Sequence, residues 1–305
     1  MGKAPGAFLS VGWRSVSRKM LAMSDRFQPD VVVANHSLVN GYVATQLAKL
    51  RGIPFITVDH EVGDFYVARE NSGWMSVLRD VNQHASLGIT VSRRMQDVAV
   101  DTIDQGHYQT IYNGASFQPC SQQLLSRHMD KDEISVFCCG NLYGRKDIPL
   151  LIRAFSEVSD QFPQARLRIA GDGPDRGSIE ALIAGLPCRD RIEMLGSIEH
   201  QQVEAEMRAA DVFALVGWEE PFGVVFLEAM ANGCPVIVSR DAGVAELLED
   251  QQSAFFTSPR DESSVRHALC ELFKSASLRA CLAKEGHALY GESCTWTARA
   301  REYRA

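Results

Sequence analysis

The sequence predicts an α/β protein built from two parallel-sheet domains. Short runs rich in Val and Ile, apolar throughout and each ending in a turn, alternate with stretches that carry apolar residues every three or four positions. Strands of this kind, alternating with helices, are typical of parallel sheets covered on both faces. A polar segment with a proline, residues 116–132, interrupts the alternation and predicts a linker. The length of 305 residues suffices for two medium domains.

The first series contains about four predicted strands, which is few for a doubly wound domain. They are Asp30–Asn35, Phe55–His60, Gly88–Ser92 and Thr110–Asn113. The second series contains about six. They are Ile134–Gly140, Leu167–Gly171, Ile192–Gly196, Val212–Gly217, Pro235–Ser239 and Ala254–Thr257. We therefore expect a first domain over residues 1–117, a second over 118–289 and a closing helix over 290–305.

The composition indicates an ordinary soluble globular protein, with 46% hydrophobic and 23% charged residues. The net charge of −7 gives no electrostatic reason to expect a nucleic acid partner. None of the eight cysteines belongs to a C-x-x-C pair or lies at zinc-finger spacing to a histidine pair. We expect reduced cysteines and no metal site.

The N-terminal stretch MGKAPGAFLSVGWRSVSRKML is basic and mildly amphipathic. It lacks a continuous apolar core and a cleavage site, so a signal peptide is not expected. It can form an ordinary surface helix of the first domain or a peripheral contact with an anionic membrane. No apolar run approaches the ~20 residues that a membrane-spanning helix needs. The predicted location is cytoplasmic, with peripheral contact at the inner membrane face as the alternative.

The stretch WEEPFGVVFLEAMANG, Trp218–Gly233, predicts a ligand site. In doubly wound sheets, ligands bind at the carboxyl ends of strands beside helix N-termini. Glu220 follows a predicted strand, and Glu228 lies roughly 1.5 turns into the next helix. The free amides at this helix start are those of Phe222, Gly223 and Val224. Carboxylates suit hydroxyls and the helix start suits phosphate, so the stretch suits a nucleotide sugar. The alternative is a helix with one acid at its start and one on its exposed face.

Two further stretches follow strands of the second series. In CGNLYGRKDIPLLIRAF, Arg145 and Lys146 stand where cations can clamp a diphosphate, or they form a solvated basic turn. In RIAGDGPDRG, the spacing G-x-G-x-x-x-G departs from the dinucleotide fingerprint, so a hydride-transfer enzyme is weakly supported. A tight turn beside a nucleotide remains consistent with these glycines.

Taken together and in order, these stretches resemble the donor domain of retaining glycosyltransferases of family 4, also called group 1, which have the GT-B fold. The resemblance runs from about Ile134 to Thr257 and includes an E-x7-E element, Glu220 and Glu228. The first half resembles the family more weakly, through QPDVVVANHS, RGIPFITVDHE and TIYNGASF. The resemblance implies two Rossmann-like domains facing a cleft, the first of them incomplete.

The resemblance also implies a reaction. A hexosyl group would move from a UDP- or GDP-sugar to the hydroxyl of a saccharide or lipid-linked acceptor, with retention of configuration and without a metal or other cofactor. Polysaccharide or glycolipid biosynthesis is the implied setting.

The implied roles fall on individual residues. Lys146 would contact the donor diphosphate, Glu220 the transferred sugar and Glu228 the ribose. The backbone of residues 222–224 would bind hydroxyls or phosphate. The remaining implied positions are Gly173 and Leu195 near the base, His60 at the reaction centre and Asn113 at the interdomain crossing.

Two departures from the family pattern support a second hypothesis. Asn141 stands where the family usually has an arginine of the diphosphate clamp, although Arg145 can substitute. The family's opening strands and glycine-rich loop have no counterpart before DVVVAN. Either another chain supplies these elements, or the sequence is a fragment, or the protein has lost part of its catalytic site. The alternative to the enzyme is therefore a non-catalytic nucleotide-sugar-binding remnant or a partner subunit of a glycosyltransferase.

Overall fold

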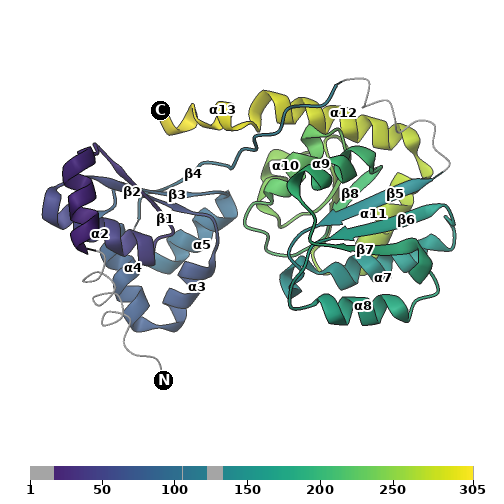
Figure 1. The fold of residues 1–305 in the computed structure, drawn as a ribbon, viewed down its shortest axis with the longest axis horizontal. Coiled ribbons are helices and arrows are strands. Elements are labelled where there is room, and N and C mark those ends of the chain that lie inside the picture. Colours follow the sequence, from purple (N-terminus) through teal and green to yellow (C-terminus); the bar gives the residue numbers. More distant parts are fainter. Residues whose placement is uncertain (1–16, 105, 122–132, 305) are drawn as a thin grey trace. The chain divides into compact units, whose positions relative to one another are not determined.

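The computed structural model describes residues 17–104, 106–121 and 133–304, and the chain forms two compact units (Figure 1). Unit 1 is Met1–Tyr112 and unit 2 is Asn113–Ala305. Each unit has one parallel sheet of its own, so the predicted α/β class with two parallel sheets is confirmed.

Unit 1 contains a four-stranded sheet in the order β1-β2-β3-β4. The strands are β1 (Val32–Asn35), β2 (Phe55–Asp59), β3 (Leu87–Thr90) and β4 (Tyr108–Thr110). The helices between them are α2 (Val39–Arg51), α3 (Gly63–Glu70), α4 (Ser72–His84) and α5 (Arg93–Ile103). Side-chain caps stabilise two of the helix starts. The Asn71 side chain accepts from the Gly73 and Trp74 amides of α4, and the Ser92 side chain accepts from the Met95 amide of α5.

The sheet of unit 1 has apolar side chains packed on both faces. Phe55 packs with a cluster that includes Ala44 of α2 and Val81 of α4. Val58, from the same strand but the opposite face, packs with Ile89 and Ile111. Burial on both faces explains the continuous apolar runs that predicted parallel strands.

Unit 2 contains a six-stranded parallel sheet in the order β10-β9-β8-β5-β6-β7. The strands are β5 (Ile134–Cys139), β6 (Ala165–Ala170), β7 (Ile192–Gly196), β8 (Val212–Leu215), β9 (Val236–Ser239) and β10 (Phe255–Thr257). The chain first builds outward from β5 to β7 and then returns to add β8 on the other side of β5. The neighbours β5 and β8 therefore form the switch point of the sheet, the usual place for a ligand in this architecture.

Helices cover both faces of this sheet, with α7 and α8 on one side and α9 and α10 on the other (Figure 1). The helices are α7 (Ile148–Ser159), α8 (Arg176–Ala184), α9 (His200–Ala209), α10 (Val224–Ala231), α11 (Glu262–Lys274), α12 (Ala276–Ser293) and α13 (Trp296–Arg299). The short 3-10 turns are η2 (Gly144–Lys146), η3 (Arg189–Arg191), η4 (Gly243–Leu247) and η5 (Glu302–Arg304). Phe213 of β8 lies edge-on between Phe137 of β5 and Phe226 of α10, which joins strand to helix at the switch point.

The domain limits differ from those expected from the sequence. The units divide after Tyr112 instead of after residue 117, because the Tyr290 hydroxyl of α12 donates to the carbonyls of Ala115 (3.2 Å) and Phe117 (2.7 Å). The expected start of the closing helix at residue 290 falls inside α12, which continues to Ser293. The predicted linker covers residues 116–132. Residues 122–132 of it lie outside the described residues.

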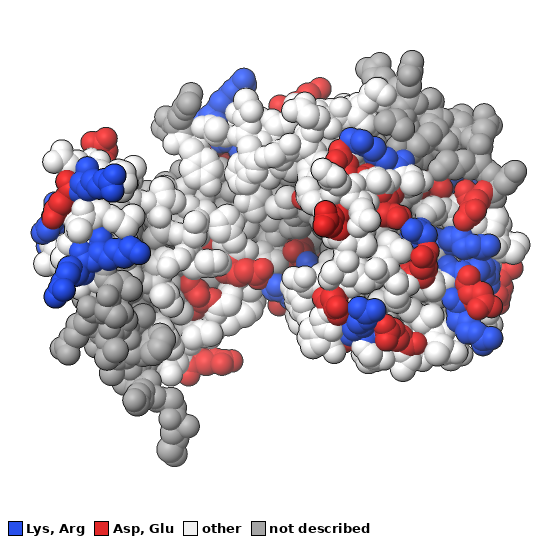
Figure 2. All heavy atoms as spheres, in the orientation of Figure 1, with Lys and Arg blue, Asp and Glu red and all other residues white. Residues whose placement is uncertain are grey.

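Charge is mixed on the surface of unit 2. Figure 2 shows basic and acidic side chains interspersed on its visible face. Arg168, for example, is paired with Glu193 and with Glu206. The expected membrane-contacting segment lies mostly outside the described residues, which begin with a helix at 17–27. Among the described helices, none combines the length and the apolar character needed to cross a membrane.

Candidate functional site

The loops after β5 and β8 meet at the switch point of unit 2. The Lys146 ammonium lies 2.5 Å from the Glu220 carboxylate, and only 12% and 14% of the two side chains are exposed. The Trp218 amide donates to the Arg145 carbonyl at 3.0 Å. A Cβ on Gly217 would come within 2.6 Å of the same oxygen, so glycine permits the close approach of the two loops. The structure thus brings together two predicted site residues that are 74 positions apart.

The loop that carries Glu220 is held in place from the side of β9. The backbone of Glu219 has a φ of +51°, and its amide donates to the Asp241 carboxylate at 2.9 Å. The Glu220 carbonyl accepts from the Gly243 amide at 3.0 Å. Asp241 was not identified from the sequence as a site residue. A Ser-x-Asp pattern at the end of a predicted strand could have indicated it, because the Ser239 hydroxyl donates to the Asp241 carboxylate at 2.6 Å.

The start of α10 presents amides to the same edge of the sheet. Gly223 is the N-cap, with a φ of +93°, and a Cβ there would lie 2.7 Å from the Phe226 ring. Among the described residues, no hydrogen-bond acceptor faces the amides of Gly223 and Val224. These donors at a positive helix end can bind anionic oxygens. Phe222 packs inside the unit, and its carbonyl accepts from the Val244 amide at 2.8 Å.

Glu228 is a half-buried carboxylate on α10. Its carboxylate oxygens make no hydrogen bond or ion pair within the described part of the chain. Burial raises its pKa above the usual value, and the charge of His200 opposes that rise. His200 begins α9, and its ring lies 4.9 Å from that of Phe117. No spacing in the sequence points to His200, because its approach to Glu228 depends on how α9 and α10 pack.

Gly173 and Leu195 lie at the carboxyl ends of β6 and β7, at the edge that also carries Lys146. A Cβ on Gly173 would collide with the Leu142 carbonyl of the loop after β5. The Gly171 amide donates to the Gly196 carbonyl at 2.8 Å, which ties the β6 loop to the residue after Leu195. The spacing of these glycines therefore reflects close contact between neighbouring loops.

The other two predicted clamp residues also belong to the loop after β5. The Arg145 guanidinium lies over the Tyr143 ring at 5.9 Å, and the Lys146 ammonium lies at the same distance from that ring. Asn141 is exposed, and its carbonyl accepts from the Tyr143 amide at 3.0 Å. A contact of either side chain with a diphosphate stays a prediction.

In unit 1, His60 follows β2 at the carboxyl end of the sheet. Burial lowers its pKa, and the nearby His36 lowers it further, against the charge of Glu61. The rings of His36 and His60 lie edge to face with centroids 6.1 Å apart. Asn113, the expected interdomain residue, is a buried residue at the beginning of unit 2.

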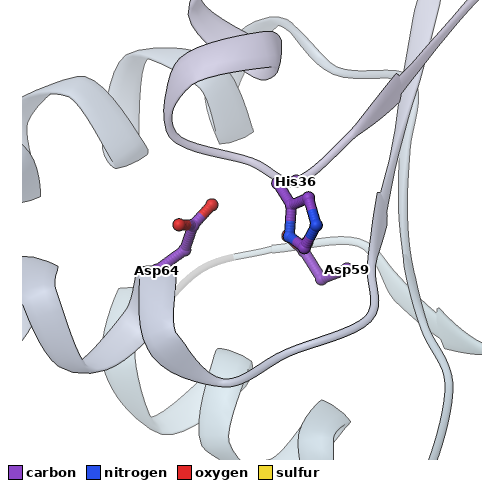
Figure 3. A group of neighbouring side chains, drawn as sticks. All are labelled: His36, Asp59 and Asp64. Carbon is purple, nitrogen blue, oxygen red and sulfur yellow. The ribbon is translucent and has the colours of Figure 1, made fainter. Parts of the chain in front are cut away.

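His36, Asp59 and Asp64 lie together at this end of the sheet (Figure 3). One potential ligand atom from each lies within 4.8 Å of the others, and imidazole and carboxylate are metal ligands. Both Asp59 oxygens, however, already accept from Ser37, from its amide at 2.8 Å and its hydroxyl at 2.6 Å. Asp64 accepts from the Leu38 amide at 2.8 Å. The two carboxylates therefore hold the loop between β1 and α2.

Two α/β units with parallel sheets, and a binding edge at the switch point of the second, define a protein of the GT-B class. The chain belongs to the family of glycosyl transferases group 1, whose model matches residues 121–288, and the model of glycosyltransferase family 4 matches residues 5–118. This confirms the family suggested by the sequence motifs.

Solved structures share the fold. Sucrose-phosphate synthase from Thermosynechococcus elongatus matches with a TM-score of 0.80 and 23% identity over 93% of this chain and 74% of its own. HepE from Anabaena, solved with UDP-glucose, matches with a TM-score of 0.77 and 22% identity over 94% of this chain and 80% of its own.

Among curated proteins, the sulfoquinovosyl transferase SQD2 of Arabidopsis thaliana is 26% identical over 264 residues, or 81% of this chain. The match covers 50% of that relative, so the chain spans about half its length.

Proposed function

We propose that this protein transfers a hexosyl group from a nucleotide diphosphate sugar to an acceptor hydroxyl, with retention of configuration. The observation that carries the proposal is the Lys146–Glu220 pair at the switch point, beside the unpaired amides of α10. A cation, a carboxylate and amide donors together match the diphosphate and hydroxyl groups of such a donor. The solved complex of HepE with UDP-glucose favours UDP over GDP as the nucleotide.

The diphosphate binds between Lys146 and the amides of residues 223 and 224. When the anomeric carbon–oxygen bond breaks, its electron pair moves to the leaving phosphate oxygen. The added negative charge strengthens the interaction with Lys146, which lowers the barrier. The acceptor oxygen bonds to the anomeric carbon on the face that the phosphate leaves, and the departing phosphate takes the acceptor proton. Glu220 exchanges part of its contact with Lys146 for a hydroxyl of the sugar.

The rest of the donor lies along the carboxyl ends of the neighbouring strands. Glu228 accepts hydrogen bonds from the ribose hydroxyls, for which its unpartnered carboxylate is suited. The base lies by the Gly173 turn and Leu195. Arg145 supplements Lys146 in place of the arginine that Asn141 replaces. These cations make a metal unnecessary for leaving-group stabilisation.

His60 serves the acceptor side of the reaction. Because burial lowers its pKa, the imidazole is neutral at pH 7 and can both donate to and accept from a hydroxyl. The acceptor is a saccharide or a lipid-linked saccharide of polysaccharide or glycolipid assembly. We place the reaction in the cytoplasm, with peripheral membrane contact where the acceptor is lipid-linked.

A second candidate is a nucleotide-sugar-binding protein without catalysis. Asn141, in the place of the usual clamp arginine, favours it. The mostly enclosed Lys146–Glu220 pair suits donor binding in either candidate. Lys146 favours the enzyme, because a cation beside the leaving phosphate stabilises the charge that develops in the transition state.

The test is calorimetric titration of the full chain with UDP, GDP and their glucose, N-acetylglucosamine and mannose conjugates. We expect micromolar binding of UDP and one UDP-sugar, followed by release of UDP from that sugar in the presence of acceptors. Binding of a nucleotide sugar without sugar transfer to any acceptor, and without its hydrolysis by water, would support the binding protein. Absence of binding to every nucleotide would refute both candidates.

A further inference from the structure

Two imidazoles lie at the carboxyl end of the sheet of unit 1 with their ring nitrogens unpaired. The His36 and His60 rings meet edge to face, at an interplanar angle of 68°. Neither ring makes a hydrogen bond or ion pair with any residue of the described chain. Both side chains are half-buried, so solvent or a ligand can reach them. An imidazole buried for packing alone usually satisfies its nitrogens within the protein.

The loop that carries His36 is held in a strained shape. His36 has a φ of +70°, an uncommon backbone for a residue other than glycine. Its amide donates to the Val58 carbonyl at 2.9 Å, and Asp59 and Asp64 bind the next two residues of the loop. Hydrogen bonds to three residues of β2 and α3 thus hold residues 36–38 where the His36 ring faces His60. Strain that the surroundings maintain in this way is typical of functional sites.

The chemistry of this cluster suits neutral hydroxyl groups. A neutral imidazole offers one donor and one acceptor, which matches a sugar hydroxyl. Asp59, Glu61 and Asp64 place negative charge around the two rings, which disfavours a phosphate group. Arg93 and Arg94, which begin α5 beyond the next strand, already have interaction partners of their own.

We infer that His36 and His60 together bind the hydroxyl groups of a neutral saccharide, and that His36 is a second positioning residue for the acceptor. That this saccharide is the acceptor rests on the proposed function, whereas saccharide binding itself concerns unit 1 alone. His36 thereby joins His60, the one histidine of unit 1 that the family resemblance indicated, as a saccharide-binding residue.

The test is a titration of the full chain, labelled with ¹⁵N in its histidine rings, with methyl α-D-glucopyranoside and separately with glucose 6-phosphate. We expect the ring signals of His36 and His60 to shift with the neutral glycoside, and the phosphate ester to bind at least tenfold more weakly. His36→Asn is the informative variant, because asparagine tolerates a positive φ. It should bind the glycoside about tenfold more weakly, and it should raise the pKa of His60 because the charge of His36 is removed.

The control is His84→Asn, an exposed histidine at the end of α4, which should leave both readouts unchanged. His60→Gln provides a second variant if His36→Asn does not fold. Glycoside binding that leaves both rings unshifted, or an unchanged affinity in His36→Asn, would overturn the inference. Broadening of the ring ¹⁵N signals of both His36 and His60 by micromolar Mn²⁺ would overturn the inference and indicate a metal site instead. UDP titration of the same sample is a separate readout, so a failed donor site is distinguished from a failed saccharide site.

Discussion

At the scale of single residues, Lys146 is the side chain on which the proposed transfer reaction depends most. Its ammonium is mostly enclosed and paired with Glu220, so charge on one residue is compensated by the other. When a diphosphate binds, its own negative charge can compensate the positive charge of Lys146. The enclosed setting makes each of these interactions stronger than it would be in water.

Lys146→Ala should lower kcat by more than tenfold with a smaller effect on donor affinity, because the charge on the leaving group is largest in the transition state. Steady-state kinetics of UDP release measure both parameters. Lys284→Ala, on an exposed face of α12, is the matched control. An unchanged kcat would show that Lys146 does not stabilise the leaving group.

Glu228→Ala should weaken UDP binding about tenfold, the loss expected for hydrogen bonds to a charged group. Burial raises the pKa of Glu228, so its carboxylate takes up a proton at a higher pH than an ordinary glutamate does. As the pH is lowered, the affinity of the wild type for UDP should therefore begin to fall earlier than an ordinary glutamate would cause. Calorimetry at several pH values tests both statements. Glu292→Ala, exposed on α12, should bind UDP as the wild type does, and equal affinity in both variants contradicts the ribose role.

Asp59 predicts a pH dependence of stability. Burial raises its pKa from 3.8 to about 6, so the folded state holds the proton more tightly than the unfolded state. This share of the folding free energy, roughly 3 kcal/mol at most, is present below pH 3.8 and lost as the pH rises through 6.

In the Asp59→Asn variant, the unfolding free energy should therefore not decrease in this way as the pH rises through 6. Urea unfolding between pH 4 and 7 measures the difference in unfolding free energy between variant and wild type. Asp30→Asn, at an exposed position before β1, should keep the slope of the wild type. A parallel slope in Asp59→Asn would mean that its carboxyl titrates normally.

At the scale of elements, the loop before α10 is held by contacts from several directions. Arg260 lies over the Trp218 ring at 4.1 Å, Asp241 holds the Glu219 amide, and the first residue of η4 holds the Glu220 carbonyl. These contacts fix Glu220 in position before any ligand arrives, which lowers the entropy cost of binding.

Gly223→Ala should disturb this element. Alanine in a left-handed backbone costs roughly 1–2 kcal/mol, and its Cβ would also press on the Phe226 ring. We expect a lower Tm and weaker UDP binding, measured by thermal unfolding and calorimetry. Gly291→Ala, with open space around it in α12, should be neutral or stabilising. Equal stability of the two variants would show that the α10 start tolerates a side chain.

At the scale of the whole molecule, each unit has its own sheet and its own buried residues. The residues proposed to bind the donor, from Lys146 to Glu228, all belong to unit 2, and the two histidines belong to unit 1. Binding of a nucleotide and binding of a saccharide can therefore be measured on different parts of one chain.

Differential scanning calorimetry should resolve two unfolding components. UDP at 100 times its Kd should stabilise only one of them, by about 2.7 kcal/mol. Gly223→Ala should lower the same component, which assigns it to unit 2. A single transition that shifts as a whole with UDP would show that the two units unfold together.

The sequence by itself determined the α/β class, the strand positions to within a few residues and the glutamates of the E-x7-E stretch. These follow from local periodicity, strand-to-helix turns and spacing, which neighbouring residues encode. Only the tertiary structure decided that β5 lies beside β8, and therefore that Lys146 meets Glu220. It also decided that Tyr290 draws residues 115 and 117 into unit 2, and that the His36 ring faces His60. Such contacts depend on strand order and packing between distant segments, which local propensities do not specify.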